Sequence, residues 1–132
     1  MTERSQRHTL TLWLISGALV LLYLGAGLPK ALGMGPAVDG FRQLGFSDHF
    51  RVLIGVLEVS GALGLLIPRV ATWAASGLAG LMLGAVCTHL ATGTPGAGLA
   101  LGALVLLLGV ARERRSEALF LDEPAPLPAT RA

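Results

Sequence analysis

The sequence predicts an all-α integral membrane protein, a four-transmembrane-helix bundle with a long, partly interfacial first extracytoplasmic loop. Of the 132 residues, 53% are hydrophobic and only 14% are charged, whereas about a quarter of the residues in a soluble domain carry charge. The mean hydropathy is +0.68, and the charges gather at the two ends and in two linkers. Four long segments are left almost free of charge. Helix is expected for each of them, because a backbone in lipid must form its hydrogen bonds internally.

The four predicted spans are residues 9–28, 50–67, 70–90 and 96–111. Each approaches the roughly 20 residues that a helix needs to cross a bilayer, although the fourth is slightly short. Residues 1–8 are expected to form a cytoplasmic N-terminus. Residues 112–132 contain three prolines and mixed charge, a composition that predicts a disordered cytoplasmic tail.

Proline and capping residues indicate where the helices begin and end. We expect Pro29 to end the first helix and Ser47 to cap the second. Thr94 is expected to cap the fourth helix, with Pro95 at its first helical position. The linker at residues 30–49 is the only long one, and its phenylalanines suggest a segment lying in the membrane interface.

The basic residues predict a multi-pass protein of the cell membrane, the bacterial inner membrane, with both termini in the cytoplasm. The residues assigned to the cytoplasmic face are Arg4, Arg7, Arg69, Arg112, Arg114 and Arg115, and those assigned to the other face are Lys30, Arg42 and Arg51. This asymmetry follows the positive-inside rule. A removable signal peptide is the alternative for the first apolar run, but the run is long for one. No basic stripe with interleaved aromatics is present, so nucleic acid is not an expected partner.

Small residues predict close helix packing. Gly80/Gly84 and Gly98/Gly102 are GxxxG pairs, which let helix backbones approach each other in lipid. With 18 glycines some pairs arise by chance, so no partner helix is assigned and a homo-oligomer remains open. Cys87 is the single cysteine. It excludes an internal disulfide, and we expect it to be a small packing residue on the same glycine face.

Glu58 is the residue most indicative of function, because it falls near the middle of the second predicted span. A carboxyl group at that depth costs several kcal/mol unless it is paired, protonated or hydrated, and such groups are functional more often than not. Gly55, Glu58 and Ala62 share one helix face, so Glu58 should point into the bundle. We therefore assign it the catalytic, proton-exchanging role, the alternative being a carboxyl that only holds helices together.

Three further residues are predicted to bind a ligand together with Glu58. Lys30 and His89 fall at the outer ends of the first and third spans, on one side of the membrane. Tyr23 lies seven residues before Lys30, so about 10 Å deeper on the same helix face. These residues would form an outer polar ring above a deeper Tyr23–Glu58 pair. The alternative is that Lys30 and His89 only anchor helix ends at the headgroups.

Several chemistries find no support in the sequence. No cluster of metal ligands is present, so no metal site is predicted. No two histidines fall within different spans, which disfavours an internal haem, and no glycine-rich nucleotide loop follows a strand. We expect no covalently bound cofactor and no electron carrier within the chain.

In their order along the chain, these features resemble the DoxX-like family. Residues 27–30 read Gly-Leu-Pro-Lys, residues 41–46 read Phe-Arg-Gln-Leu-Gly-Phe, and residues 55–69 carry Glu58 and end in Pro-Arg. The resemblance covers about residues 12–111 and implies a four-helix membrane bundle associated with membrane redox systems. Relatives include a subunit of thiosulfate:quinone oxidoreductase and a membrane component of oxidant-defence complexes. Lys30, Glu58 and His89 fall where the polar positions of the family are expected.

The leading functional hypothesis is a small subunit of a membrane redox system that binds a quinone-like molecule. Glu58 would exchange protons, Lys30 and His89 would hydrogen-bond the carbonyl oxygens, and a redox partner protein would supply electrons. Two alternatives remain open: a proton-coupled small-molecule transporter, and a structural subunit with no activity of its own. Whether the chain is itself an enzyme is also left open.

Overall fold

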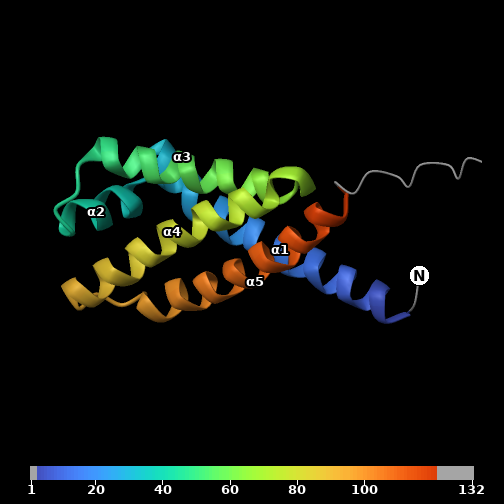
Figure 1. Ribbon diagram of the computed structural model, residues 1–132. Helices are drawn as coiled ribbons and strands as arrows, with labels where there is room; N and C mark the ends of the chain where they lie inside the picture. The colour runs from blue at the N-terminus through green and yellow to red at the C-terminus, as the bar shows by residue number, and fades with distance from the viewer. Residues whose placement is uncertain (1–2, 122–132) are drawn as a thin grey trace, which may run out of the picture.

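The computed structural model describes residues 3–121, with side chains for residues 6–115. Within this range the chain is all-helical, as predicted, with no strand (Figure 1). The helices are α1 (Glu3–Leu32), α2 (Gly35–Gln43), α3 (Asp48–Leu65), α4 (Pro68–Thr92) and α5 (Ala97–Leu121).

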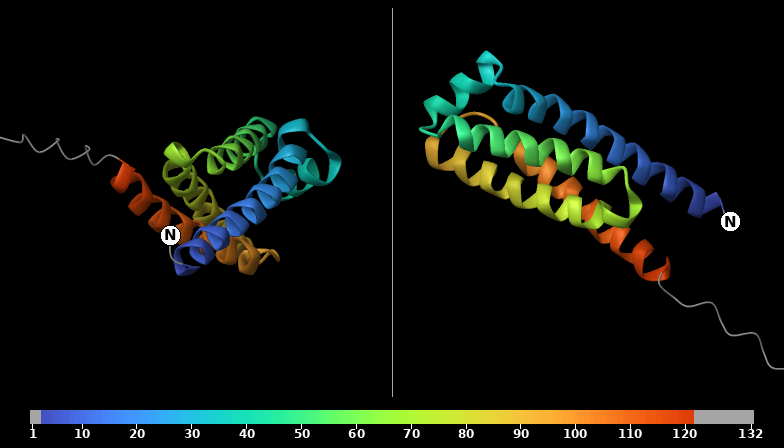
Figure 2. Two further views of the ribbon diagram at one scale, coloured as in Figure 1. Left: turned by 90° about the vertical axis from the view of Figure 1, so that its right-hand side faces the viewer. Right: turned by 90° about the horizontal axis from the view of Figure 1, so that it is seen from above.

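The four long helices lie side by side, and successive ones run in opposite directions (Figures 1 and 2). The short helix α2 lies at the end of the bundle where α1 finishes and α3 begins. Extensive contacts join α1 to α3, α3 to α4 and α4 to α5, whereas α1 and α5 touch only sparsely. The bundle is therefore well packed on three sides and loosely closed on the fourth.

The outer surface of the bundle is apolar. Large hydrophobic side chains are exposed on every long helix, including Leu14, Leu57, Leu83 and Leu101. Two helical stretches, Gln6–Leu32 and Pro68–Thr92, are long and apolar enough to cross a membrane. Helix α3 is less apolar because Asp48, Arg51 and Glu58 all lie within its 18 residues. An apolar exterior around a packed interior is what a helix bundle surrounded by lipid presents.

The interior is built from leucine, alanine, valine and one tyrosine. Leu19 and Tyr23 of α1 pack in one cluster with Ala62, Leu78 and Leu107 from the other three long helices. The alanines let the helices approach closely, and the leucines fill the space between them. Tyr23 is the largest fully buried side chain.

The ends of α1 and α3 test the predicted boundaries. Ser47 caps α3 as predicted, since its Oγ accepts a hydrogen bond from the Phe50 amide at 3.2 Å. The prediction that Pro29 ends the first helix was wrong, because α1 continues to Leu32. A proline removes one backbone hydrogen bond, which a membrane helix tolerates. The end of α1 comes instead at Gly33, whose φ of 72° allows the Met34 amide to bond the Pro29 carbonyl at 2.9 Å.

The boundaries of α5 also differ from those predicted. Helix α5 begins at Ala97 rather than at Pro95, because the Thr94 side chain bonds to His89 instead of capping a helix. At its other end α5 continues to Leu121, so residues 112–121 are helical where a disordered tail was predicted. Residues 122–132 lie outside the described part of the chain. The predicted N-terminal segment is likewise helical from Glu3.

The glycine pairs predicted to pack helices face outward. A Cβ atom added at Gly80, Gly84, Gly98 or Gly102 would meet nothing within 4 Å, so none of these positions is a helix crossing among the described residues. Cys87 is exposed, not packed as predicted. Sequence spacing identifies residues that share a helix face, but it does not say which way that face points.

Candidate ligand site at a buried ion pair

One face of α3 carries every buried residue of that helix. These residues are Arg51, Gly55, Glu58, Ala62 and Leu65. Their spacing of three or four residues places them in one line along the helix. Two charged side chains therefore point into the bundle, and the prediction that Glu58 faces inward is confirmed, with 2% of the residue exposed.

Glycines bring α1 and α3 unusually close together at this line. A Cβ at Gly27 would lie 2.9 Å from the Cβ of Glu58 and 3.0 Å from the Gly55 carbonyl oxygen. A Cβ at Gly55 would overlap the Ala31 amide nitrogen and lie 2.8 Å from the Gly27 carbonyl oxygen. Because neither glycine has a side chain, the two backbones touch, and Lys30 is carried to within reach of Glu58.

Lys30 and Glu58 form a direct ion pair across this crossing. The Lys30 Nζ lies 2.7 Å from Glu58 Oε1 and 2.6 Å from Oε2. The Glu58 side chain is almost fully buried and that of Lys30 is 20% exposed. Pairing of this kind makes a buried charge tolerable, and removing either partner would leave the other uncompensated. The pair therefore fixes α1 against α3 and holds the carboxylate in the bundle.

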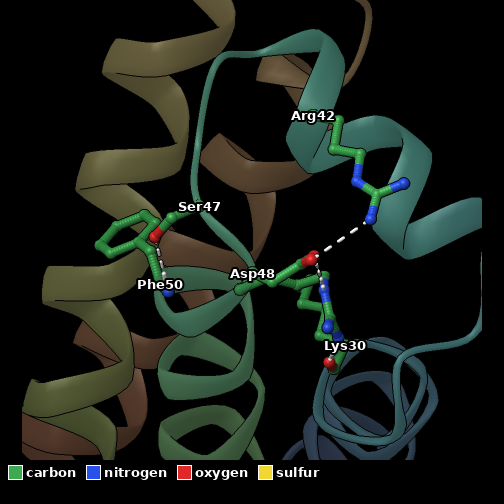
Figure 3. A network of polar contacts seen from close by, with 6 residues as sticks. Lys30, Arg42, Ser47, Asp48 and Phe50 are labelled. Atoms are coloured by element: carbon green, nitrogen blue, oxygen red, sulfur yellow. Dashed lines mark hydrogen bonds and ion pairs between the residues drawn. The ribbon is translucent and has the colours of Figure 1, made fainter.

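Arg51 links the ion pair to the end of the bundle. Its guanidinium is buried and donates a hydrogen bond to the Lys30 backbone carbonyl. Arg51 Nε lies 3.4 Å from Asp48 Oδ1, and Asp48 Oδ2 lies 3.3 Å from an Arg42 guanidinium nitrogen, as Figure 3 shows for Arg42 and Asp48. The Arg42 side chain, followed by Arg51, lowers the pKa of Asp48 below its usual value. The network thus joins α1, α2 and α3.

Tyr23 lies beside the ion pair with an unused hydroxyl group. The residue is 1% exposed, and its Oη is buried without a hydrogen-bond partner among the described residues. Tyr23 lies one helical turn before Gly27, whose added Cβ would lie 2.9 Å from the Cβ of Glu58. A buried hydroxyl that lacks a partner is costly, and it is the group that a bound polar atom would satisfy.

His89 lies at the same end of the bundle but is engaged elsewhere. Like Lys30, it occupies the last turn of its helix, and α1 and α4 run in the same direction (Figure 2). Its Nδ1 lies 2.9 Å from Thr94 Oγ1, and a Cβ at Gly96 would lie 2.7 Å from its ring. Within the described residues its hydrogen bond therefore goes to the α4–α5 turn and not to Lys30 or Glu58.

Sequence reasoning missed the contribution of Arg51, which it treated only as a topology signal. The information was present, because Arg51 lies seven residues before Glu58 and four before Gly55 and so shares their face. The bond to the Lys30 carbonyl was not predictable, because it depends on where α1 ends. Among the described residues no group of three potential metal ligands occurs.

Comparison with known proteins identifies the family of the chain. The model of the DoxX-like family matches residues 14–112, which is most of the chain and includes all four candidate site residues. Comparisons with curated proteins and with solved structures gave no match. The chain is a helical membrane protein and belongs to the DoxX-like family.

Proposed function

We propose that the protein crosses the bacterial inner membrane four times, through α1, α3, α4 and α5, with both termini in the cytoplasm. The apolar exterior of all four helices supports this arrangement. Six arginines gather toward the end of the bundle where α1 begins and α5 ends, as the positive-inside rule requires for a cytoplasmic face. The charges of α3 fit this picture, because Glu58 is paired and Arg51 and Asp48 lie near the end of the helix.

The site that we assign to this protein binds a quinone-like small molecule in the extracytoplasmic half of the bundle. The observation that carries the assignment is the Lys30–Glu58 ion pair beside the unpartnered Tyr23 hydroxyl. A quinone presents carbonyl oxygens, which accept hydrogen bonds from an ammonium or a phenol. A hydroquinone must release protons when it is oxidised, and a buried carboxylate is a suitable acceptor. Glu58 is the proton-exchanging group, and Lys30 and Tyr23 are the donors.

His89 is the second carbonyl ligand in this proposal. Thr94 occupies its Nδ1, so Nε2 is the ring nitrogen that remains for a ligand. The α4–α5 turn holds the ring by that bond and by its contact with Gly96. Because Lys30 and His89 lie in the last turns of α1 and α4, a flat ligand at this end would lie between the two helices.

The chain acts as a small subunit of a membrane redox system rather than as a complete oxidoreductase. Conversion of a quinone to a hydroquinone consumes two electrons and two protons. Glu58 accounts for proton exchange, and a redox partner protein supplies or removes the electrons. The lipid bilayer is the second partner, since it delivers the apolar ligand sideways into the bundle.

Quinone binding by the purified protein tests the proposal. Native mass spectrometry with a short-tailed ubiquinone is expected to show one bound molecule, with binding at least tenfold weaker in Glu58→Gln and Tyr23→Phe. Asp39→Asn is the matched control, because Asp39 is an exposed carboxylate on α2. Wild-type affinity in both site variants, together with unchanged quinone-linked activity in the host, would reject the assignment.

A structural role is the competing function, and one observation favours it. The ion pair lies beside the Gly27–Gly55 crossing, where it holds α1 on α3. A purely structural pair predicts that Glu58→Gln loses stability but retains quinone affinity in the folded fraction. Proton-driven uptake of a solute into liposomes would instead identify the chain as a transporter.

A further inference from the structure

Helices α1 and α5 leave an apolar groove along their sparse contact. One part of it, about 230 Å³, is lined by Leu12 and Ile15 of α1 and by Gly109 of α5. A second part, about 690 Å³, is lined by Leu22, Gly98 and Gly102, among others. Val105 and Leu106 line both parts, so the two parts adjoin each other along α5, and together they are called the α1–α5 groove. Its glycine floor is open, since a Cβ at any of the three glycines would meet nothing within 4 Å.

The two ends of the α1–α5 groove differ in polarity. At one end His8 Nε2 lies 3.4 Å from Glu113 Oε2, and both residues line the groove. Exposed arginines flank the same end: Arg7 precedes Thr11 by one turn of α1, and Arg112 follows Gly109 by one turn of α5. The other end is lined by apolar residues and glycine alone. The α1–α5 groove is therefore apolar along its length and positively charged at one end, which we call its mouth.

We propose that the α1–α5 groove binds one anionic phospholipid. An acyl chain lies along the glycine floor, and the phosphate lies between Arg7 and Arg112. Glu113 offsets one unit of the positive charge at the mouth, so the two arginines leave the mouth with a net positive charge. Basic residues at a membrane surface attract anionic headgroups, and a floor without side chains gives a flexible methylene chain room to lie flat.

The charges argue against a second copy of the chain as the occupant. A two-fold axis along the membrane normal would place the same surface of both copies together. The arginines at the mouth of one groove would then face those of the other, and like charges repel. A lipid with a negative headgroup and an apolar chain matches both ends of the groove. This inference is independent of the quinone proposal, since it uses none of the site residues.

Lipid binding measured by native mass spectrometry tests the headgroup contact. Phosphatidylglycerol is expected to bind about thirtyfold more tightly than phosphatidylcholine of the same acyl length, because two basic contacts at about 1 kcal/mol each sum to about 2 kcal/mol. The double variant Arg7→Gln/Arg112→Gln should abolish this preference. Arg69→Gln/Arg115→Gln is the matched control: it removes two exposed arginines from the same end of the bundle but leaves the mouth intact, so the preference should remain.

Filling the groove tests the chain contact. Gly109→Leu places a side chain on the floor, where an added Cβ meets nothing within 4 Å, and should weaken binding of both lipids at least tenfold. Gly77→Leu, at an equally open position on α4, should not. An unchanged preference for phosphatidylglycerol in the arginine double variant would overturn the proposal. So would a dimer that Gly109→Leu dissociates while lipid binding stays constant.

Discussion

At the scale of single residues, the polar contacts at one end of the bundle form a connected series. Glu58 pairs with Lys30, the carbonyl of Lys30 accepts from Arg51, and Arg51 and Arg42 share Asp48. The series runs from the buried interior to exposed side chains. Each buried charge therefore has a partner nearer the surface, which is how a carboxylate is accommodated within an apolar bundle.

The exposed end of this series gives a prediction about pH. The folded protein lowers the pKa of Asp48, chiefly through Arg42. A lowered folded-state pKa adds stability above the ordinary value of about 3.9, and that stability is lost as the pH falls through the lowered value. The protection factors of the α2 amides against hydrogen exchange should therefore fall as the pH drops below about 4. Asp48→Asn should remove this pH step and exchange faster at neutral pH.

The control for this measurement is Asp39→Asn, on the same short helix. Asp39 is exposed, so its removal should leave the acid step in place. An acid step of wild-type size in Asp48→Asn would show that the contact between Arg42 and Asp48 does not hold α2.

At the scale of helices, the position of the site follows from glycines rather than from charges. Gly27 and Gly55 let α1 and α3 touch, and this contact sets the distance between Lys30 and Glu58. The sequence identified Glu58 and its face, because an i, i+3, i+7 pattern is a property of one helix. It did not predict the ion pair, because the rotation and crossing of two helices depend on which small residues meet.

The same reason explains why the predicted glycine pairs do not pack helices. Gly80/Gly84 and Gly98/Gly102 have the spacing of packing motifs, but the crossings that form use Gly27, Gly55, Gly61 and Gly64 instead. Neither spacing nor composition distinguishes the two groups. The two groups of glycines differ in what lies opposite them. Leu78 lies against Gly61 and Lys30 against Gly55, and a large side chain on the partner helix requires a glycine opposite it.

The helix crossing predicts the effect of a single methyl group. Gly55→Ala would place its Cβ against backbone atoms of α1, so α1 and α3 must separate and the Lys30–Glu58 pair must lengthen. We expect a loss of about 1–3 kcal/mol in unfolding free energy, the usual range for overpacking, measured by thermal denaturation in detergent. Gly77→Ala, with nothing within 4 Å, should be neutral or slightly stabilising. Equal stability of the two variants would contradict the close crossing.

At the scale of the whole molecule, the fold class was predictable and the termini of the elements were less so. Composition and apolar runs identified the long helices, because lipid exposure leaves few alternatives to a helix. The helix boundaries predicted from Pro29 and Pro95 were wrong, because tertiary contacts around a proline can outweigh its local backbone preference. The continuation of α5 to Leu121 was not predicted, because the prolines and mixed charge of residues 112–132 indicated a disordered tail.

The proposed topology predicts which turns face the cytoplasm. In a Cys87→Ser background, Thr94→Cys in the α4–α5 turn should react with a membrane-impermeant maleimide in intact spheroplasts. Arg69→Cys, at the start of α4, should react only after the membrane is opened. Labelling of both variants from the same side would contradict four spans with both termini in the cytoplasm.

The proposed function requires that the Lys30–Glu58 pair is a ligand site in addition to holding α1 against α3. The most direct test is the charge-swapped protein Lys30→Glu/Glu58→Lys, compared with the two single variants in thermal stability and in quinone binding. We predict that the swap recovers much of the stability lost in the single variants, while quinone affinity remains at least tenfold below wild type because the donor and the proton acceptor have exchanged places. A swapped protein that binds quinone as tightly as wild type would contradict the account.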